Sequence, residues 1–399
     1  MTTETAASVS APRFYSSRDP ERALVSFEAA LLAGLAPDGG LYLPEFVPRL
    51  KPDTWLGAAS PAELGERVFG AWLGGAHAPA ELRELLADAL DFPLPLVEIA
   101  DGVWVLELFH GPTLSFKDVG ARVMARLMER ALARRGERRI ILVATSGDTG
   151  SAVADGFAGM SRLAVVLLYP KGLVSPVQER QLIVRRPRVR ALAVEGDFDD
   201  CQRLVKAAFA DSALAGLPLS SANSINVGRL LPQTLYYLWA ARELHRLGVA
   251  GAPPNLCVPS GNLGNLTAAV LAGRMGLGVH RFIAAHNANR FFPEFLAERA
   301  QPFAFARTVP TRSNAMDVGA PSNFERLHAL LGPGELRERV WGSSVDDAST
   351  LERIRRTRRE AGYLACPHTA VGLEALELYR AATGDRRAAV VAAPAHPAK

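Results

Sequence analysis

The stretch RIILVATSGDTGS, residues 139–151, joins an apolar run to a loop of small polar residues that leads into a helix. The run RIILVAT (139–145), rich in β-branched residues, is typical of a buried parallel strand. Similar runs follow at LAVVLLY (163–169), RALAV (190–194), NLCVPS (255–260) and HRFIAAH (280–286), with helix-length segments between them. This spacing predicts βαβ units, and hence an α/β fold with parallel sheets.

Two loops follow predicted strands and consist of small residues: TSGDTGS (145–151) and SGNLGN (260–265). Ligands bind at the carboxyl ends of parallel strands, and small residues leave backbone N–H groups free to approach an anion. Each loop is therefore a candidate anion site, and each is equally compatible with a tight turn. Neither has the Gly-Lys-Ser/Thr of a Walker loop or the G-x-G-x-x-G dinucleotide pattern.

A third polar stretch, SSANSINVGRL (220–230), places Asn223, Ser224, Asn226 and Arg229 within seven residues. A guanidinium with neighbouring amide and hydroxyl donors suits a dianionic phosphate. The alternative is a helix capped by Ser224 or Asn226, with Arg229 on the solvent face.

A helix is expected to begin near Lys117 in ELFHGPTLSFKDVGARVMARL (107–127). Its apolar residues repeat with the spacing of one buried helical face. These residues are Phe116, Val119, Val123, Met124, Leu127 and Met128. Ser115, followed three residues later by Asp118, matches a capping box, so we expect Ser115 to cap this helix.

Lys117 itself occupies an unusual position for a lysine. In the first turn, the positive end of the helix dipole disfavours a second positive charge. Phe109, Leu114 and Phe116 surround it in sequence, so its pKa should be lowered, which makes an amine nucleophilic toward a carbonyl group. The alternative is a lysine whose stem covers apolar surface while its ammonium group reaches water.

The composition is that of a globular protein with two or three domains: 399 residues, 49% hydrophobic and 22% charged. The net charge is +4, and the basic clusters ARRGERR (133–139) and RIRRTRR (353–359) are interpreted as solvated helix faces. Nucleic-acid binding is not expected, whereas a small anionic substrate suits this charge.

Metal binding and a disulfide framework are not expected either. Cys201, Cys257 and Cys366 are odd in number and far apart, and the histidines show no H-E-x-x-H spacing. The chain has no secretory signal pattern and no apolar run of spanning length, so a cytoplasmic location without membrane contact is predicted.

The two ends of the chain differ from its α/β part. Residues 1–96 are expected to be mainly helical, with helices in 21–35 and 61–73, and DFPLPLVEI (91–99) is expected to be a connector. The Ala- and Pro-rich end VVAAPAHPAK (390–399) is interpreted as a low-complexity segment.

Taken together, six stretches resemble the threonine synthase family, in its longer type with an N-terminal extension. They are LELFHGPTLSFKD, TSGDTGSAVA, SSANSIN, VPSGNLGN, SNAMDVGAPSN and AHPAK, in order from about residue 14 to the end. The resemblance implies the tryptophan synthase β-like fold of fold type II pyridoxal phosphate enzymes, with the cofactor in a cleft between two α/β domains. It implies conversion of O-phospho-L-homoserine and water to L-threonine and phosphate.

The resemblance also implies roles for individual residues. Lys117 would form the Schiff base with pyridoxal 5'-phosphate and move protons at the substrate. The cofactor phosphate would be held by the backbone N–H groups of Gly261, Asn262, Leu263, Gly264 and Asn265. Asp148 would touch the cofactor ring, Ser146, Gly147 and Thr149 would bind the substrate carboxylate, and Asn223, Ser224 and Arg229 would bind its phosphate.

The implied domain organisation divides the chain into three parts: an N-terminal region (1–96), a large cofactor-binding domain (97–135 and 223–399) and a small domain (136–222). A homodimer is compatible with this fold class. Two alternatives to a threonine synthase are a related phospho-lyase that releases phosphate, ammonia and a 2-oxo acid, and a non-catalytic ligand-binding relative.

Two departures from the family pattern bear on activity. Pro394 stands where the family has a threonine, which leaves the pyridine nitrogen of the cofactor without a hydroxyl partner, and Thr369 is the nearest replacement in sequence. The chain also stops at Lys399, where long-type relatives continue, and we expect both departures to reduce activity.

Overall fold

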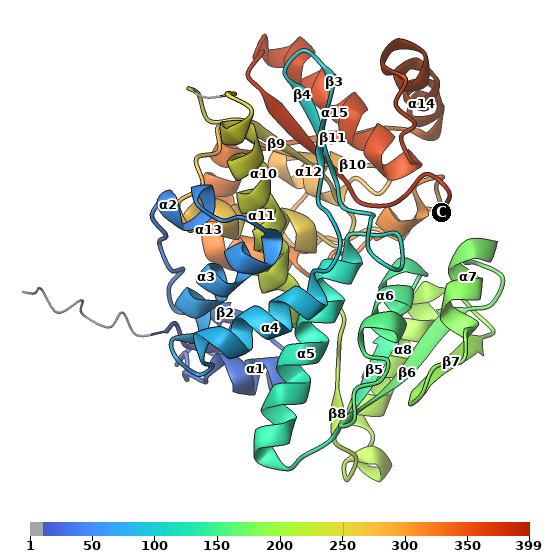
Figure 1. The fold of residues 1–399 in the computed structure, drawn as a ribbon. Helices are drawn as coiled ribbons and strands as arrows, with labels where there is room; N and C mark the ends of the chain where they lie inside the picture. Colours follow the sequence, from blue (N-terminus) through green and yellow to red (C-terminus); the bar gives the residue numbers. More distant parts are fainter. Residues whose placement is uncertain (1–10, 250) are drawn as a thin grey trace, which may run out of the picture.

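The larger of two parallel sheets is assembled from segments at opposite ends of the chain. The computed structural model describes residues 11–249 and 251–399, and the sheet has the order β11-β10-β9-β12-β4-β3 (Figure 1). Its strands are β3 (Leu96–Ala100), β4 (Val103–Glu107), β9 (Asn255–Pro259), β10 (Phe282–His286), β11 (Val340–Ser344) and β12 (Ala389–Ala393). Neighbouring strands are parallel except at the edge, where β3 is antiparallel to β4.

Two segments that were not predicted as strands belong to this sheet. The Ala- and Pro-rich end includes part of β12, which lies inside the sheet, paired with β4 on one side and β9 on the other. The connector predicted at 91–99 ends in the edge strand β3, where Val97 pairs with Val105. In both cases the pairing partners, which are distant in sequence, make the strand.

The smaller sheet has the order β7-β6-β5-β8, with all strands parallel. Its strands are β5 (Arg139–Ala144), β6 (Leu163–Pro170), β7 (Val189–Val194) and β8 (Leu219–Ser220). The runs at 139–145, 163–169 and 190–194 are thus confirmed as strands. Helices α6 (Asp148–Gly156), α7 (Pro176–Ile183) and α8 (Phe198–Ala210) connect them, and the helices lie around this sheet in Figure 1.

Helices also fill the N-terminal region and surround the larger sheet. They are α1 (Phe27–Ala33), α2 (Asp53–Leu56), α3 (Pro61–Leu73), α4 (Pro79–Ala89), α9 (Val227–Leu230), α10 (Thr234–Arg246), α11 (Gly264–Arg274), α12 (Phe291–Leu296), α13 (Phe324–Arg339), α14 (Asp347–Ala361) and α15 (Pro367–Thr383). The helix predicted at 61–73 is confirmed as α3.

The N-terminal region is mainly helical, as expected, but its first helix is shorter than predicted. Helix α1 starts at Phe27 because Ser26 caps it, accepting from the N–H of Ala29. Val25 is held in extended form by pairing with Phe14 of β1 (Phe14–Ser16). β1 also pairs antiparallel with β2 (Tyr42–Pro44), so the region contains a small sheet as well.

Helix α5 (Lys117–Arg135) packs against α4, α6 and α9 and carries Lys117 as its first residue. The predicted apolar face is confirmed, since Val119, Val123 and Met128 are buried. The predicted capping box is wrong. Ser115 Oγ is buried without a hydrogen-bond partner in the described chain, while Asp118 accepts from Thr113 N at 2.9 Å and Thr113 Oγ1 at 2.5 Å. The Asp118 carboxylate therefore holds the preceding turn instead of capping the helix.

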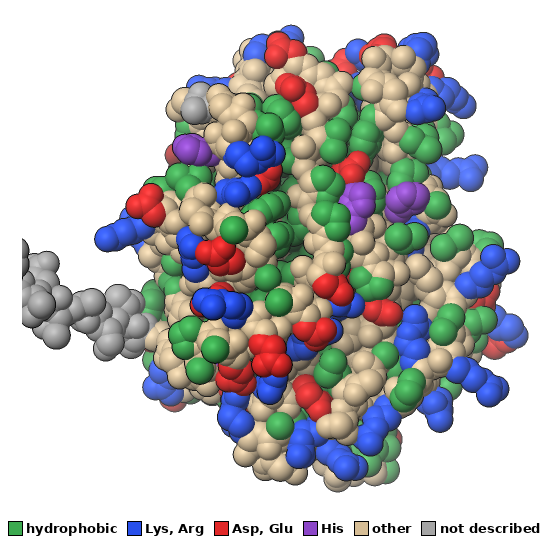
Figure 2. Space-filling view, in the orientation of Figure 1, with side chains coloured by type: hydrophobic (Ala, Val, Ile, Leu, Met, Phe, Trp, Pro, Cys, Tyr) green, Lys and Arg blue, Asp and Glu red, His purple; other side chains and the backbone are tan. Residues whose placement is uncertain are grey.

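Basic side chains in both clusters form ion pairs with acidic residues. Arg134 and Arg135 on α5 pair with Glu28 at 2.7 and 2.8 Å, and Arg353 on α14 pairs with Glu374 of α15 at 2.7 Å. Figure 2 shows basic side chains interspersed with acidic ones over the face in view. These clusters therefore link neighbouring helices, which gives no support to nucleic-acid binding. None of the helices in the described chain has the length and apolar character that a membrane crossing requires.

Candidate active site

A cavity of about 530 Å³ lies where the carboxyl ends of β5, β9 and β12 meet. The residues that directly follow these strands, Thr145, Ser260 and Pro394, line its wall, and α5 supplies Lys117. Small-molecule sites span about 300–1,000 Å³, so the cavity has room for a cofactor-sized ligand. The predicted site residues that line it are Lys117, Ser146, Asp148, Thr149, Asn223, Ser224, Arg229, Gly261, Asn262, Leu263, Gly264 and Asn265.

The loop SGNLGN presents a row of backbone donors at the start of α11. In the described chain, no protein atom accepts a hydrogen bond from the N–H of any residue from 261 to 265. Leu263 is left-handed (φ 59°), which turns successive N–H groups toward one point. A Cβ on Gly261 would lie 2.8 Å from the Cα of Met316, so this position requires glycine. The loop is built as an anion cradle.

Asn265 is fixed at the edge of this cradle by two tyrosines. The hydroxyl groups of Tyr236 and Tyr237 donate to its Oδ1 at 2.5 and 2.7 Å. Its Nδ2 is buried and has no partner in the described chain. Because both acceptor lone pairs of Oδ1 are occupied, the side chain is oriented as a donor.

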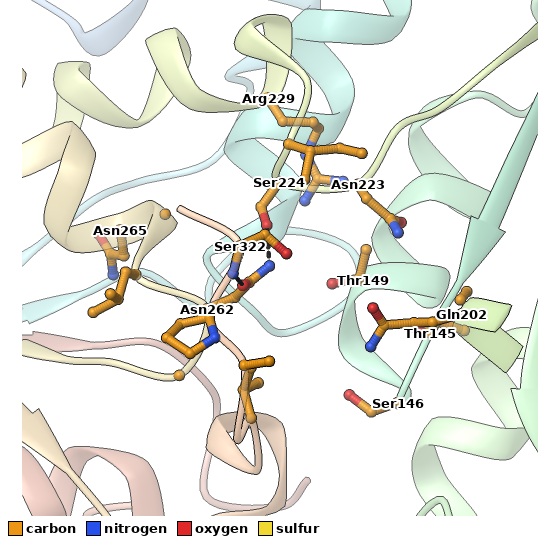
Figure 3. Close-up of a pocket in the computed structure, with 18 of the residues that line it drawn as sticks. Thr145, Ser146, Thr149, Gln202, Asn223, Ser224, Arg229, Asn262, Asn265 and Ser322 are labelled. Carbon is orange, nitrogen blue, oxygen red and sulfur yellow. Dashed lines mark hydrogen bonds between the residues drawn. The ribbon is translucent and has the colours of Figure 1, made fainter. Parts of the chain in front are cut away.

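The loop TSGDT faces this cradle from the smaller sheet, and Figure 3 shows Ser146 and Thr149 across the cavity from Asn262 and Ser224. Thr145 Oγ1 shapes the loop by accepting from Gly147 N at 3.0 Å and Gly150 N at 2.7 Å. No protein acceptor in the described chain is bonded to the N–H groups of Ser146, Asp148 or Thr149. This loop is a second anion site.

Gly147 lies just behind the cavity wall. Its N–H is already bonded to Thr145, its φ is +129°, and a Cβ there would meet Gln178 Cδ at 2.5 Å. Gly147 therefore provides the turn and the space, and the free donors come from its neighbours.

In the stretch 220–230, one residue caps a helix and others line the cavity, so the helix cap and the candidate phosphate site are both present. Asn226 caps α9, accepting from Gly228 N at 2.8 Å. Ser224 instead faces the cavity, where its Oγ accepts from Asn262 Nδ2 at 2.7 Å, a bond drawn in Figure 3. Arg229 is not on the solvent face: it is only 3% exposed and lines the cavity.

The guanidinium of Arg229 is buried without a carboxylate partner in the described chain. Its Nη1 donates to the carbonyl of Ala222 at 2.6 Å, and its Nε has no hydrogen-bond partner there. Burial lowers the pKa of Arg229 to about 10, and Asp118 opposes this shift from a distance. A buried cation is costly unless it is paired, so this site is suited to an anion supplied by a ligand.

Lys117 faces the cavity and is half-buried. Burial lowers its pKa to about 8, Asp148 raises it, and the cations Lys399 and Arg229 lower it further. Its Nζ lies 5.3 Å from the centre of the Phe116 ring. The pKa shift has the expected direction, and the residue lines the cavity.

Sequence reasoning missed the residues that hold Asp148. Lys399 Nζ lies 2.8 Å from Asp148 Oδ1, and Gln178 Nε2 donates to the same oxygen at 2.9 Å. Burial opposes ionisation of Asp148, but the ammonium groups of Lys399 and Lys117 hold the pKa of its carboxyl group well below the ordinary value. The AHPAK stretch was the available signal for Lys399, whereas nothing around Gln178 marks it.

The sequence offered Thr369 as a replacement partner for the cofactor, but its hydroxyl group lies 3.2 Å from Cys366 Sγ instead. Among the described residues that line the cavity, Pro394 and His368 are present and Thr369 is not. The carbonyl of Pro394 accepts from Phe116 N at 2.8 Å, which ties the end of β12 to the start of α5.

Comparison with known proteins agrees with this geometry. The family model described as "Pyridoxal-phosphate dependent enzyme" matches residues 91–393, so the chain is an enzyme of that class. A second model, "Threonine synthase N terminus", matches residues 13–90. The chain belongs to the threonine synthase family, and its activity is that of a threonine synthase.

Individual relatives extend over nearly the whole chain. The threonine synthase of Haemophilus influenzae is 40% identical over 389 residues, which cover 96% of this chain and 88% of that protein. The crystal structure of the Escherichia coli threonine synthase superposes with a TM-score of 0.88 at 38% identity, covering 97% of this chain and 89% of that one. The structure of threonine synthase with bound PLP from Brucella melitensis also gives 0.88, at 36% identity and the same coverage.

Proposed function

We propose that the chain converts O-phospho-L-homoserine and water to L-threonine and phosphate in the cavity beside Lys117. The choice of this substrate is supported by Arg229. Its buried guanidinium lines the cavity and lacks a carboxylate partner in the described chain. Its neighbours Asn223 and Ser224 also line the cavity. An amino acid with a terminal phosphate would supply the missing anion.

Pyridoxal phosphate fits the residues that are present. The free N–H groups of residues 261–265 would hold its phosphate, and the close approach of Met316 to Gly261 keeps that loop compact. Lys117 would bind its aldehyde carbon. When bound, the cofactor withdraws electrons from the carbons next to the substrate's amino group.

The chain's own groups would carry out the proton transfers and orient the substrate. The free N–H groups of Ser146, Asp148 and Thr149 would hold the substrate carboxylate, so that Cα faces the amine of Lys117. A neutral Lys117 amine can take protons from Cα and Cβ, because its pKa is near neutrality. Arg229 would stabilise the phosphate as the Cγ–O bond breaks. One of the two protons would be delivered to Cγ, which becomes the methyl group, and the other would be returned to Cα. Water would supply OH to Cβ and its remaining proton to the departing phosphate.

We also propose the three-part division of the chain given above, the N-terminal region (1–96), the large domain (97–135 and 223–399) and the small domain (136–222). It is supported by the strands, since β5 to β8 fall within 136–222. A homodimer stays a prediction. A cytoplasmic location is supported by the three cysteines, which are all free and buried.

The test is product analysis with purified full chain, pyridoxal phosphate and O-phospho-L-homoserine. We expect threonine and phosphate in equal amounts. Phosphate with ammonia and a 2-oxo acid would identify the phospho-lyase instead, and no turnover would indicate the ligand-binding relative. Homoserine without its phosphate is the matched control, and we expect it not to react.

A further inference from the structure

Lys399 is the most thoroughly enclosed of the cations around the cavity that make an ion pair. Its side chain is 3% exposed and that of its partner Asp148 is 4% exposed. Its Nζ is held by two oxygens, Asp148 Oδ1 and the carbonyl of Thr113, each at 2.8 Å. Two short contacts from fixed acceptors give the ammonium group one defined position.

Asp148 lies between two lysines but pairs with only one of them. Its Oδ1 pairs with Lys399 and also accepts from Gln178 Nε2 at 2.9 Å. Lys117 interacts with Asp148 through charge, yet no carboxylate in the described chain lies within ion-pair distance of Lys117. Two partners thus hold Oδ1 of Asp148, and one of them, Lys399, balances the charge of the carboxylate.

We propose that Lys399 is a positioning residue of the active site, whose buried ion pair with Asp148 keeps that carboxylate from pairing with Lys117. The inference rests on the proposed role of Lys117 as the amine that binds the cofactor. An unpaired carboxylate beside Lys117 would hold it as an ammonium ion, which is not nucleophilic. Lys399 removes this effect while leaving the Asp148 backbone N–H free.

Three other titratable groups lie near Lys117 and Asp148. Arg229 reaches it from α9, Asp118 follows Lys117 on α5, and His368 approaches from α15. Burial lowers the pKa of His368 to about 4, so His368 is neutral at pH 7 and does not respond to the changes proposed below. Asp118 is held by Thr113, and Arg229 remains charged at neutral pH.

The experiment measures the pH at which Lys117 of the full-length apo-protein reacts. The protein is treated with pyridoxal phosphate and cyanoborohydride at a series of pH values, and the label on the Lys117 peptide is quantified by mass spectrometry. We expect a midpoint near pH 8 for the unmodified chain. Lys399→Met should raise the midpoint by about one pH unit, and Lys399→Arg should leave it nearly unchanged because the charge is retained.

Asp148→Asn distinguishes an effect of Lys399 that acts through the Asp148 carboxylate from direct repulsion between the ammonium groups of Lys399 and Lys117. In that background, Lys399→Met should shift the midpoint by less than half as much, because no carboxylate remains to be freed. An equal shift in both backgrounds, or no shift in either, overturns the proposal. Lys171→Met, which removes a lysine exposed on the surface and paired with Glu195, is the matched control.

Two complications have defined outcomes. If the label falls on a lysine other than Lys117, the proposed function of Lys117 fails, and not only this inference. If Lys399→Met does not fold, as judged by circular dichroism, Lys399→Gln is measured in its place. The absorbance spectrum of bound pyridoxal phosphate against pH then gives a second measurement on the holoenzyme, and it should shift in the same direction.

Discussion

Asn262 donates from Nδ2 to the hydroxyl oxygen of Ser224 at 2.7 Å, and this bond joins the SGNLGN loop to the stretch that carries Arg229. Asn323 Nδ2 approaches the same oxygen at 3.3 Å and the Asn262 carbonyl at 3.2 Å. One hydroxyl group thus connects the proposed cofactor cradle with the proposed substrate-phosphate site.

Ser224→Ala should therefore weaken both ligands. A hydrogen bond of this kind is worth about 0.5–1.5 kcal/mol, which corresponds to roughly a two- to tenfold loss of affinity for pyridoxal phosphate. The KM for O-phospho-L-homoserine should rise as well. Titration of the apo-protein and steady-state kinetics measure the two effects, with the exposed Ser212→Ala as control. A change in only one of the two ligands would contradict the coupling.

Arg229→Met should separate stability from function. The variant removes a buried charge that has no carboxylate partner, so its melting temperature without phosphate should be unchanged or higher. Its kcat/KM should fall by at least about 100-fold, since two charge-assisted bonds are each worth about 1.5–3 kcal/mol. Thermal unfolding with and without inorganic phosphate measures the first effect. Arg203→Met, on the exposed face of α8, is the control. A large loss of melting temperature would indicate a structural role.

The rate at which Lys117 reacts with pyridoxal phosphate should depend on pH with a midpoint near 8, because its pKa is lowered to about 8. Below that pH the amine is protonated and unreactive, and the rate should rise with pH and level off above it. Between about pH 8 and pH 10.5 the unfolded chain binds more protons at this lysine than the folded chain, so the contribution of Lys117 to stability increases with pH. Stopped-flow absorbance at the cofactor wavelength gives the rate profile. A midpoint near 10.5 would show that burial does not perturb this amine.

Tyr236→Phe and Tyr237→Phe should be non-additive. Each single variant leaves one donor on Asn265 Oδ1, so its effect should be small. The double variant leaves that oxygen unsatisfied and buried, at a cost of about 1–3 kcal/mol. Urea unfolding should show this extra loss, and affinity for pyridoxal phosphate should fall with it. Additive single effects would mean that Asn265 finds another donor.

The sequence could predict the strands whose own residues favour extended structure. The runs at 139–145 and 163–169 are rich in Ile, Val and Leu and lie buried in the smaller sheet. β12 consists mainly of alanine and valine before a proline, and only its pairing with β4 and β9 makes it a strand. That pairing depends on residues far away in the chain, which a local pattern does not contain.

Prediction of the candidate site from sequence is limited for the same reason, because its side-chain contacts also join residues that are far apart in the chain. The loops of small residues were recognisable, because free backbone donors follow from their composition and position. The direction of Arg229 was open, since a helix of four residues has too little periodicity to define a buried face. It is settled by packing against α5, where a Cβ on Gly120 would lie 3.2 Å from Arg229 Nε. Gln178 and Lys399 reach Asp148 from distant elements, and no local spacing relates them.

The pairing of β4 with β12 also constrains the order in which the chain can fold. Val103 and Ala389 lie side by side in the larger sheet, with all the strands of the smaller sheet between them in sequence. Closing so long a loop is entropically costly and slow, whereas β5 and β6 are near neighbours in the chain and can pair early. Pro394, which lines the cavity, and Lys399, which pairs with Asp148, follow β12 and come into place only after that closure. Ligand affinity should therefore be the last property to recover during refolding, well after most helical circular dichroism has returned.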